Sequence, residues 1–439
     1  MDRDVKFALA LMMVIGTLGP MGGNLILPMV SVLKNEFHTD VSMIMLSVTL
    51  FMVPFALVQF ISGGLSDVYG RRPLITAGLA IYGLGFILAS ATASIWWFIA
   101  ARVVQGAGNA LAAPVLIAVI GDLTGAESRG RWMGVYSSAL RTGMAIAPFV
   151  GGVMAYHWRV LFVAMGVLSF AVAACSWVCL GKLKGGTRTR GELVTDLKSV
   201  VRNRGVIALS AAGFVTFFSY VALMSITSDV LTSFPYFSDP NSVGLILSVS
   251  GAAGIVSASI AGFLTDKFGR RIVPATGAAV AALSLLALAA VTVHPSPLLP
   301  FYYIPNVLGE SVQGLNPQTY IFLFTFQSIM RSATVNVFVY FLVLMSIMGL
   351  GISFIWPSLL ALSVEIVPPH QRGTAASVFN GTRFLGYSIA PTVFASVYLQ
   401  AGLDAAFLLS AAMLGLVVGV IYLTTGNYAR IRSDEEVST

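Results

Sequence analysis

Three arginines lie inside long apolar stretches of this chain, where an ionised side chain is costly and usually serves a function. They are Arg102, Arg141 and Arg383. Other polar residues share a helical face with Arg102 or Arg383, and these are Gln105, Asn109, Asn380 and Tyr387. No carboxylate lies in the middle of the first or fourth apolar stretch, and Asn24 is the polar residue at that depth of the first one. These residues predict a cavity of positive potential, which suits neutral, zwitterionic or anionic solutes.

The three arginines differ in how far they lie from the ends of their stretches. Arg102 lies near one end, so its side chain could also extend to the outer interface of a membrane. Arg141 and Arg383 lie near the middle, and each is expected to line a cavity or to pair with an acid.

The composition indicates the elements that hold these residues. The chain has 439 residues, of which 57% are hydrophobic and only 10% are charged, which excludes soluble, disordered and nucleic-acid-binding classes. A helix needs about 20 apolar residues to span a bilayer. We therefore predict an all-α membrane protein with twelve transmembrane helices, at 6–32, 42–62, 73–92, 95–120, 131–155, 160–181, 205–231, 242–262, 272–293, 335–363, 374–399 and 404–425.

The basic residues predict the orientation of these helices. Outer loops hold Lys34, Arg159 and Arg331 if both termini are cytoplasmic, and nearly all other basic residues outside the spans then face the cytoplasm. Because cytoplasmic loops are enriched in Lys and Arg, the protein is predicted to lie in the cell membrane with both termini inside.

Two internal repeats divide the chain into two halves. The segment 63–72 recurs at 262–271, and the set Pro114, Asp122, Arg129 recurs as Pro357, Glu365, Arg372. The repeats predict two pseudo-symmetric six-helix bundles at 1–181 and 205–430, a basic cytoplasmic linker at 182–204 and a cytoplasmic tail at 431–439. The second half contains an outer-loop insertion, 294–334, in which 320–330 is apolar enough for a short interfacial helix. This insertion is either a lid or partner site, or a tolerated surface loop.

Two six-helix halves with a repeated Gly-x-Leu-x-Asp-x-x-Gly-Arg-Arg loop resemble the major facilitator superfamily. The resemblance covers the whole chain, and it implies a latch that holds the halves together on the cytoplasmic side, where the alternative is a basic turn that only sets topology. The implied latch residues are Gly63, Asp67, Gly70, Arg71, Arg72, Asp122, Arg129, Gly262, Asp266, Gly269, Arg270, Arg271, Glu365 and Arg372. The stretch from Arg102 to Gly108 resembles the fourth-helix motif of the superfamily, whose arginine is implicated in proton transfer.

The fifth apolar stretch carries small residues at a spacing of four, which lets helices approach closely. Gly143, Pro148, Gly151 and Gly152 also resemble the fifth-helix signature of drug:proton antiporters, and Gly254 belongs to a matching stripe in the eighth stretch. Ordinary close packing explains the stripes alone equally well. Together with the signature, they favour efflux over uptake.

These features predict a secondary active transporter, without cofactor or metal, that works as a monomer in the lipid bilayer and exports a small organic solute by alternating access. If protons drive it, then Asp229, Asp122 or Glu365 must titrate, and Tyr220, Asn336 and Tyr340 are further residues that could line the path. The alternatives are uptake or exchange of an organic anion or other metabolite and, from another class, a membrane receptor that does not transport. No constellation of catalytic residues indicates an enzyme.

Overall fold

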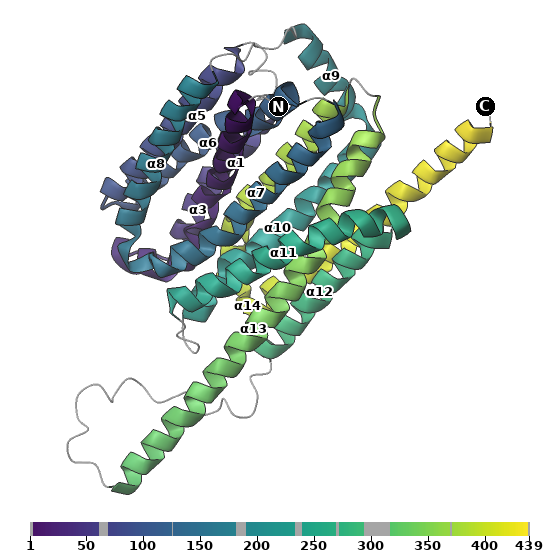
Figure 1. Cartoon of the computed structure of the whole chain (residues 1–439). Helices are drawn as coiled ribbons and strands as arrows, with labels where there is room; N and C mark the ends of the chain where they lie inside the picture. The colour runs from purple at the N-terminus through teal and green to yellow at the C-terminus, as the bar shows by residue number, and fades with distance from the viewer. Residues whose placement is uncertain are drawn as a thin grey trace.

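This computed structural model describes residues 3–60, 69–124, 126–180, 190–232, 239–268, 272–293, 317–368 and 371–437. These ranges are almost entirely helical and contain no β-strand. The helices form two bundles that lie side by side (Figure 1).

The first bundle begins with an interrupted helix. Helix α1 (Arg3–Asn24) is followed by a short 3-10 turn, η1 (Leu27–Met29), and by α2 (Val30–Phe37). Pro28 at the start of η1 has no N–H to continue the hydrogen bonds of α1, which explains why the helix breaks there. The remaining elements are α3 (Val41–Gln59), α5 (Arg71–Ala91), α6 (Ile95–Leu123), α7 (Ala126–Val153), η2 (Ala155–His157) and α8 (Trp158–Cys179).

The second bundle follows a connecting helix, α9 (Arg190–Arg202). It consists of α10 (Arg204–Thr232), α11 (Pro240–Phe268), α12 (Ile272–Val293), α13 (Pro317–Glu365) and α14 (Arg372–Val437). Gly402 interrupts α14 with a φ of 89° and a ψ of 174°, a conformation that glycine adopts readily. This break lies between the last two predicted stretches, so α14 consists of two helices joined at Gly402.

The predicted membrane helices are confirmed as helices. Nine helical segments of the described chain are long and apolar enough to cross a membrane, and one of them, Thr374–Tyr422, contains two predicted stretches. Helices α7 and α11 occupy the fifth and eighth predicted stretches. The predicted domain limits stay a prediction, since residues 182–189 of the predicted linker lie outside the described residues.

The predicted loop 294–334 is wrong in its second part. Residues 317–334 do not form a separate interfacial helix but run without interruption into α13, which begins at Pro317. Proline is well tolerated at the first position of a helix, and no other proline follows before Pro357. Residues 294–316 lie outside the described ranges.

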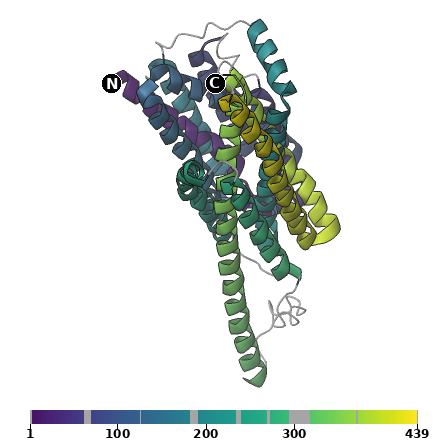
Figure 2. The ribbon, with the colours of Figure 1, turned by 90° about the vertical axis from the view of Figure 1, so that its right-hand side faces the viewer.

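Both chain termini lie at the same end of the molecule, which we call the terminal side, and we call the opposite end the distal side (Figures 1 and 2). The first part of α13 projects beyond the other helices on the distal side (Figure 2). The two bundles therefore extend roughly between these two sides, as spanning helices must.

The two halves meet mainly along two helix pairs, α3 with α14 and α7 with α11. In the first pair, the hydroxyls of Thr49 and Thr392 are 2.8 Å apart, and the rings of Phe55 and Phe384 are 4.8 Å apart in an edge-on arrangement. In the second pair, Gly152 of α7 approaches the backbone of Pro240 and Gly244 in α11. The lack of side chains on these glycines is what lets the backbones of the two halves touch.

Related glycines hold equivalent helix crossings inside each half. A Cβ on Gly143 of α7 would overlap the Thr17 carbonyl of α1, and a Cβ on Gly386 of α14 would overlap the Phe214 carbonyl of α10. Gly143 and Gly386 also correspond in the second sequence repeat. The internal repeat is therefore present in three dimensions as the same helix contact.

We expect Gly143→Ala to lower the thermal unfolding midpoint of the purified protein, because a methyl group at this crossing costs about 1–3 kcal/mol through overpacking. Gly415→Ala in α14 is the matched control, since no atom lies within 4 Å of a Cβ at that position. Alanine favours helix more than glycine does, so this control should keep or raise the midpoint. Equal midpoints for the two variants would contradict close packing at Gly143.

Candidate functional site

Arg102 of α6 is fully buried within the N-terminal half. Its Nη1 donates to the Gly22 carbonyl of α1 at 2.7 Å and to Oε1 of Gln105, and its guanidinium carbon lies 4.2 Å from the centre of the Phe51 ring. Its Nε and Nη2 have no hydrogen-bond partner among the described residues. The alternative that Arg102 extends to the interface is therefore wrong.

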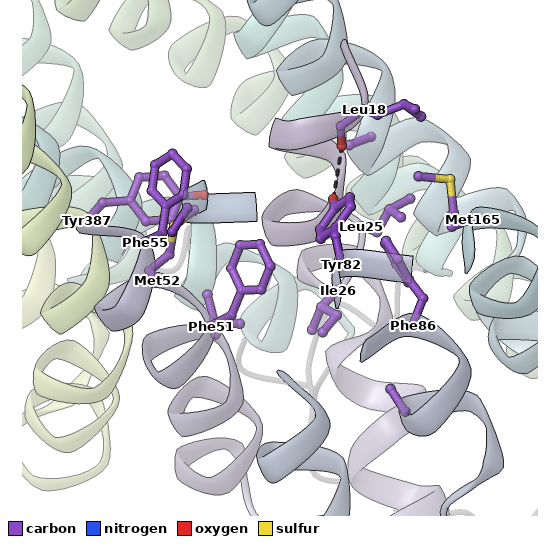
Figure 3. Close-up of a cluster of buried hydrophobic side chains, with 14 of the residues drawn as sticks. Leu18, Leu25, Ile26, Phe51, Met52, Phe55, Tyr82, Phe86, Met165 and Tyr387 are labelled. Atoms are coloured by element: carbon purple, nitrogen blue, oxygen red, sulfur yellow. Dashed lines mark hydrogen bonds between the residues drawn. The ribbon is translucent and has the colours of Figure 1, made fainter. Parts of the chain in front are cut away.

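Two other side chains bind the same part of α1. Asn109 Nδ2 donates to the Gly19 carbonyl at 3.1 Å. The Tyr82 hydroxyl of α5 accepts from the Gly22 N–H at 2.9 Å and lies 3.0 Å from the Leu18 carbonyl, to which it donates (Figure 3). These contacts hold the last turns of α1, where Pro20 lacks the N–H of a helical hydrogen bond. Sequence reasoning missed Tyr82 because it lies within an apolar stretch.

Arg141 and Arg383 come together at the boundary between the two halves. Their guanidinium carbons lie 5.1 Å and 4.5 Å from the centre of the same Trp356 ring, which belongs to α13. Arg141 projects from α7 of the N-terminal half and donates to the Gly254 carbonyl of α11 at 3.0 Å. The structure thus brings together two arginines that are distant in sequence. Trp356 was not predicted.

The surroundings of Arg383 are aromatic. Its guanidinium carbon also lies 4.6 Å from the centre of the Phe217 ring and 4.4 Å from that of Phe384. Its side chain is buried, and no carboxylate of the described residues forms an ion pair with it. Arg383 Nε, Trp356 Nε1 and Asn380 Oδ1 are buried without a hydrogen-bond partner in the described part of the chain. We call Arg141, Arg383 and Trp356 the arginine cluster.

A small pocket lies on the distal side of the arginine cluster. The Tyr387 hydroxyl of α14 donates to Asn24 Oδ1 of α1 at 3.0 Å, and this bond links the two halves. The pocket measures about 10 Å³, room for one water molecule. Its lining comes from both halves and consists of Asn24, Leu27, Met144, Pro148, Tyr220, Val221, Met224, Leu247 and Tyr387. Three predicted polar residues, Asn24, Tyr220 and Tyr387, thus line one space.

An ion pair between the two halves lies farther toward the distal side than this pocket. Lys34 Nζ of α2 lies 2.5 Å from Asp229 Oδ1 of α10, so the pair joins the two halves. The side chain of Asp229 is only 5% exposed, whereas that of Lys34 is 26% exposed. Asp229 was predicted as a residue that could titrate, but its pairing with Lys34 was not predicted.

On the terminal side, the structure describes only part of the predicted latch. Arg71 Nε donates to Asp122 Oδ2 at 2.9 Å, which ties α5 to α6 within one half. Arg72 lies instead over the Trp177 ring, 3.8 Å from its centre. Gly70 has a φ of 89°, so a side chain would be strained there.

Other predicted latch residues are not described by the structure. Outside the described residues are Gly63, Asp67, Gly269, Arg270 and Arg271, and no side-chain placement is described for Arg129, Asp266 and Arg372.

Two predicted path residues lie in the first half of α13. The Tyr340 hydroxyl donates to the Ala287 carbonyl of α12 at 2.9 Å, so this side chain binds a neighbouring helix of its own half. The side chain of Asn336 lies outside the described parts. Tyr340 is not among the described residues that line the pocket.

The sequence of the chain is similar to those of known membrane transporters. The sequence profile of the Major Facilitator Superfamily matches residues 12–325 and 317–437. The chain is 24% identical over 395 residues to the "Bacillibactin exporter" of Bacillus subtilis (strain 168), which covers 87% of each protein. It is 29% identical over 307 residues to the "Multidrug resistance protein MdtM" of Escherichia coli (strain K12), which covers 66% of this chain and 70% of that protein.

Solved structures share the fold. A bacterial homolog of the human lysosomal transporter Spinster, in an inward-facing and unoccupied conformation, has a TM-score of 0.71 with 16% sequence identity and covers 98% of both chains. A D-xylose–proton symporter has a TM-score of 0.70 with 15% identity and covers 95% of this chain and 97% of its own. At this level of identity, the likeness concerns the fold alone.

Proposed function

Since the chain belongs to the Major Facilitator Superfamily, we propose that it is a secondary active transporter that exports a small organic solute in exchange for protons. The observation that carries this proposal is the pocket lined by both halves, together with the Lys34–Asp229 ion pair that joins the halves on the distal side. Access from that side requires the halves to separate, which is the movement of alternating access.

The orientation of the protein is part of this proposal. The basic residues favour a cytoplasmic terminal side, so the distal side faces outward and the conformation described here is closed to the outside. The protein would then lie as a monomer in the cell membrane. Export is supported by the antiporter-like Gly143, Pro148, Gly151 and Gly152, and by the names of the two relatives.

Asp229 is the acid whose place best suits coupling to protons. Asp122 has 44% of its side chain exposed and is paired within one half, whereas Asp229 is buried at the contact between the halves. Protonation of Asp229 would remove the charge that attracts Lys34, and it would weaken the contact between the two halves on the distal side.

The alternative function is uptake or exchange of an organic anion, which the arginine cluster favours. Export and import differ in the direction of the driving gradient. Export in exchange for protons moves solute toward the acidic compartment, whereas uptake together with protons moves it away from that compartment.

Liposomes that contain the purified full chain test this proposal with 2-naphthoate and the cation ethidium as probes. With an acidic lumen, we expect at least one probe to accumulate inside, and a proton ionophore should abolish the accumulation. A weak acid is passively excluded from an acidic lumen, so accumulation of 2-naphthoate there requires transport. Asp229→Asn should remove the dependence on the gradient. Accumulation above protein-free liposomes only with an alkaline lumen, or no movement of either probe, would overturn export.

A further inference from the structure

We propose that the arginine cluster binds the anionic group of an organic anion whose aromatic body packs on the rings around Arg383. This proposal rests on the proposed transport function and names the class of solute. The charges of the cluster are not balanced. Two guanidinium groups lie against one indole ring, and the described residues supply no carboxylate that pairs with either of them. Intramembrane charges without a counter-ion mark sites for a ligand of opposite charge.

The hydrogen-bonding groups of the cluster indicate an oxyanion. Arg383 Nε and Trp356 Nε1 are buried N–H donors without an acceptor among the described residues. The aromatic rings around Arg383 attract its charge, but ring faces do not replace the strong acceptors that a planar guanidinium binds best. A carboxylate or similar group beside Trp356 would supply acceptors for these donors and would lie close to both positive charges.

The position of the cluster makes it suitable for a transported solute. Arg141 comes from the N-terminal half, while Arg383 and Trp356 come from the C-terminal half. A bound anion would therefore contact both halves, and its affinity would change when they rock apart. Arg383 is buried, but Arg141 and Trp356 are only partly buried, so part of the cluster is exposed.

The surrounding rings indicate the remainder of the ligand. Phe217 and Phe384 lie near Arg383, and Phe55 packs edge-on against Phe384 from the other half. Aromatic rings favour offset or edge-on contacts with another ring. A planar aromatic body with one negative group fits this combination, whereas an organic cation would be repelled by two like charges in a medium of low dielectric constant.

Equilibrium dialysis of the detergent-purified full chain with radiolabelled 2-naphthoate and 2-naphthamide tests the proposal. The two probes have nearly the same shape but differ in charge. We expect the anion to bind the wild type about tenfold or more tightly than the amide, since ion pairs in buried sites contribute strongly. Arg141→Gln and Arg383→Gln should each remove most of this preference, whereas Arg202→Gln on the exposed surface of α9 should retain it.

Each other outcome has a defined meaning. If Arg383→Gln fails to give a monodisperse protein, Arg141→Gln decides, because that side chain is only partly buried. Failure of 2-naphthoate to bind, equal binding of anion and amide, or a preference that survives Arg141→Gln would overturn the anion site. Selective binding of 2-naphthoate without gradient-driven movement would leave the site in place and overturn the proposed export. Proton-driven movement of ethidium alone would do the reverse.

Discussion

Replacing Lys34 by methionine should open the distal side of the protein. Asp229 would then remain buried without its partner in the closed conformation, which typically costs about 3–5 kcal/mol, whereas water can hydrate it when the halves separate. Such a difference changes the ratio of closed to open molecules by about a hundredfold or more. We therefore expect Lys34→Met to favour the conformation that is open on the distal side.

A cysteine at position 27 measures this opening. Leu27 belongs to the first half, but its side chain is 1% exposed and packs in the hydrophobic core of the second half. In a background with Cys175→Ala and Cys179→Ala, Leu27→Cys should react with a polar maleimide about tenfold faster or more when Lys34→Met is added. The control Lys198→Met changes an exposed lysine of α9 and should leave the rate unchanged.

A charge exchange separates the ion pair from other effects of the substitution. The double variant Lys34→Asp, Asp229→Lys should restore slow labelling, because it forms the same pair in reverse. If Lys34→Met leaves the labelling rate at its wild-type value, the ion pair does not hold the distal side closed.

Arg102→Met should stabilise the fold and impair transport. Methionine has a similar length and no charge, and it removes an ionised group whose burial costs several kcal/mol. Arg102 is fully buried in the folded protein, and its Nε and Nη2 have no hydrogen-bond partner in the described part of the chain. We expect a thermal unfolding midpoint equal to or above that of the wild type.

The same substitution should reduce gradient-driven movement of the solute about tenfold or more, since small displacements of a site have effects of this size. Arg102 holds the Gly22 carbonyl, two residues before Asn24, which lines the pocket and binds Tyr387. Its loss would displace that edge of the pocket.

Arg159→Met is the matched control for stability. Arg159 pairs with Glu36 at 2.8 Å and donates to the Ser90 and Thr92 carbonyls, at 2.7 Å each. Because its donors have partners, this substitution should lower the midpoint. A lower midpoint in Arg102→Met with normal transport would show that Arg102 is a structural residue.

Much of the fold could be predicted from apolar length and repeats. The helical stretches were found because a bilayer imposes a length and an apolar composition that can be read locally. The exception is the second part of 294–334, where the prolines suggested an outer loop with a separate short helix at 320–330, while the structure joins the residues from Pro317 onward to α13. A single proline can begin a helix as well as prevent one.

Less of the candidate site could be predicted. Arg141, Arg383, Asn24 and Tyr387 were identified because polar groups are conspicuous in apolar segments. Trp356 and Tyr82 were missed, since aromatic residues are common in such segments and gain importance only through what they touch.

The sequence therefore identified the membrane class, the positions of the helices and the residues too polar to be there by chance, because each follows from short-range chemistry along one helix. Which of these residues meet depended on how the helices cross. Gln105 and Asn109 lie with Arg102 inside one half, whereas Arg141 and Arg383 share one ring between the halves. Lys34 and Asp229 are 195 residues apart in the chain, and packing alone makes them partners.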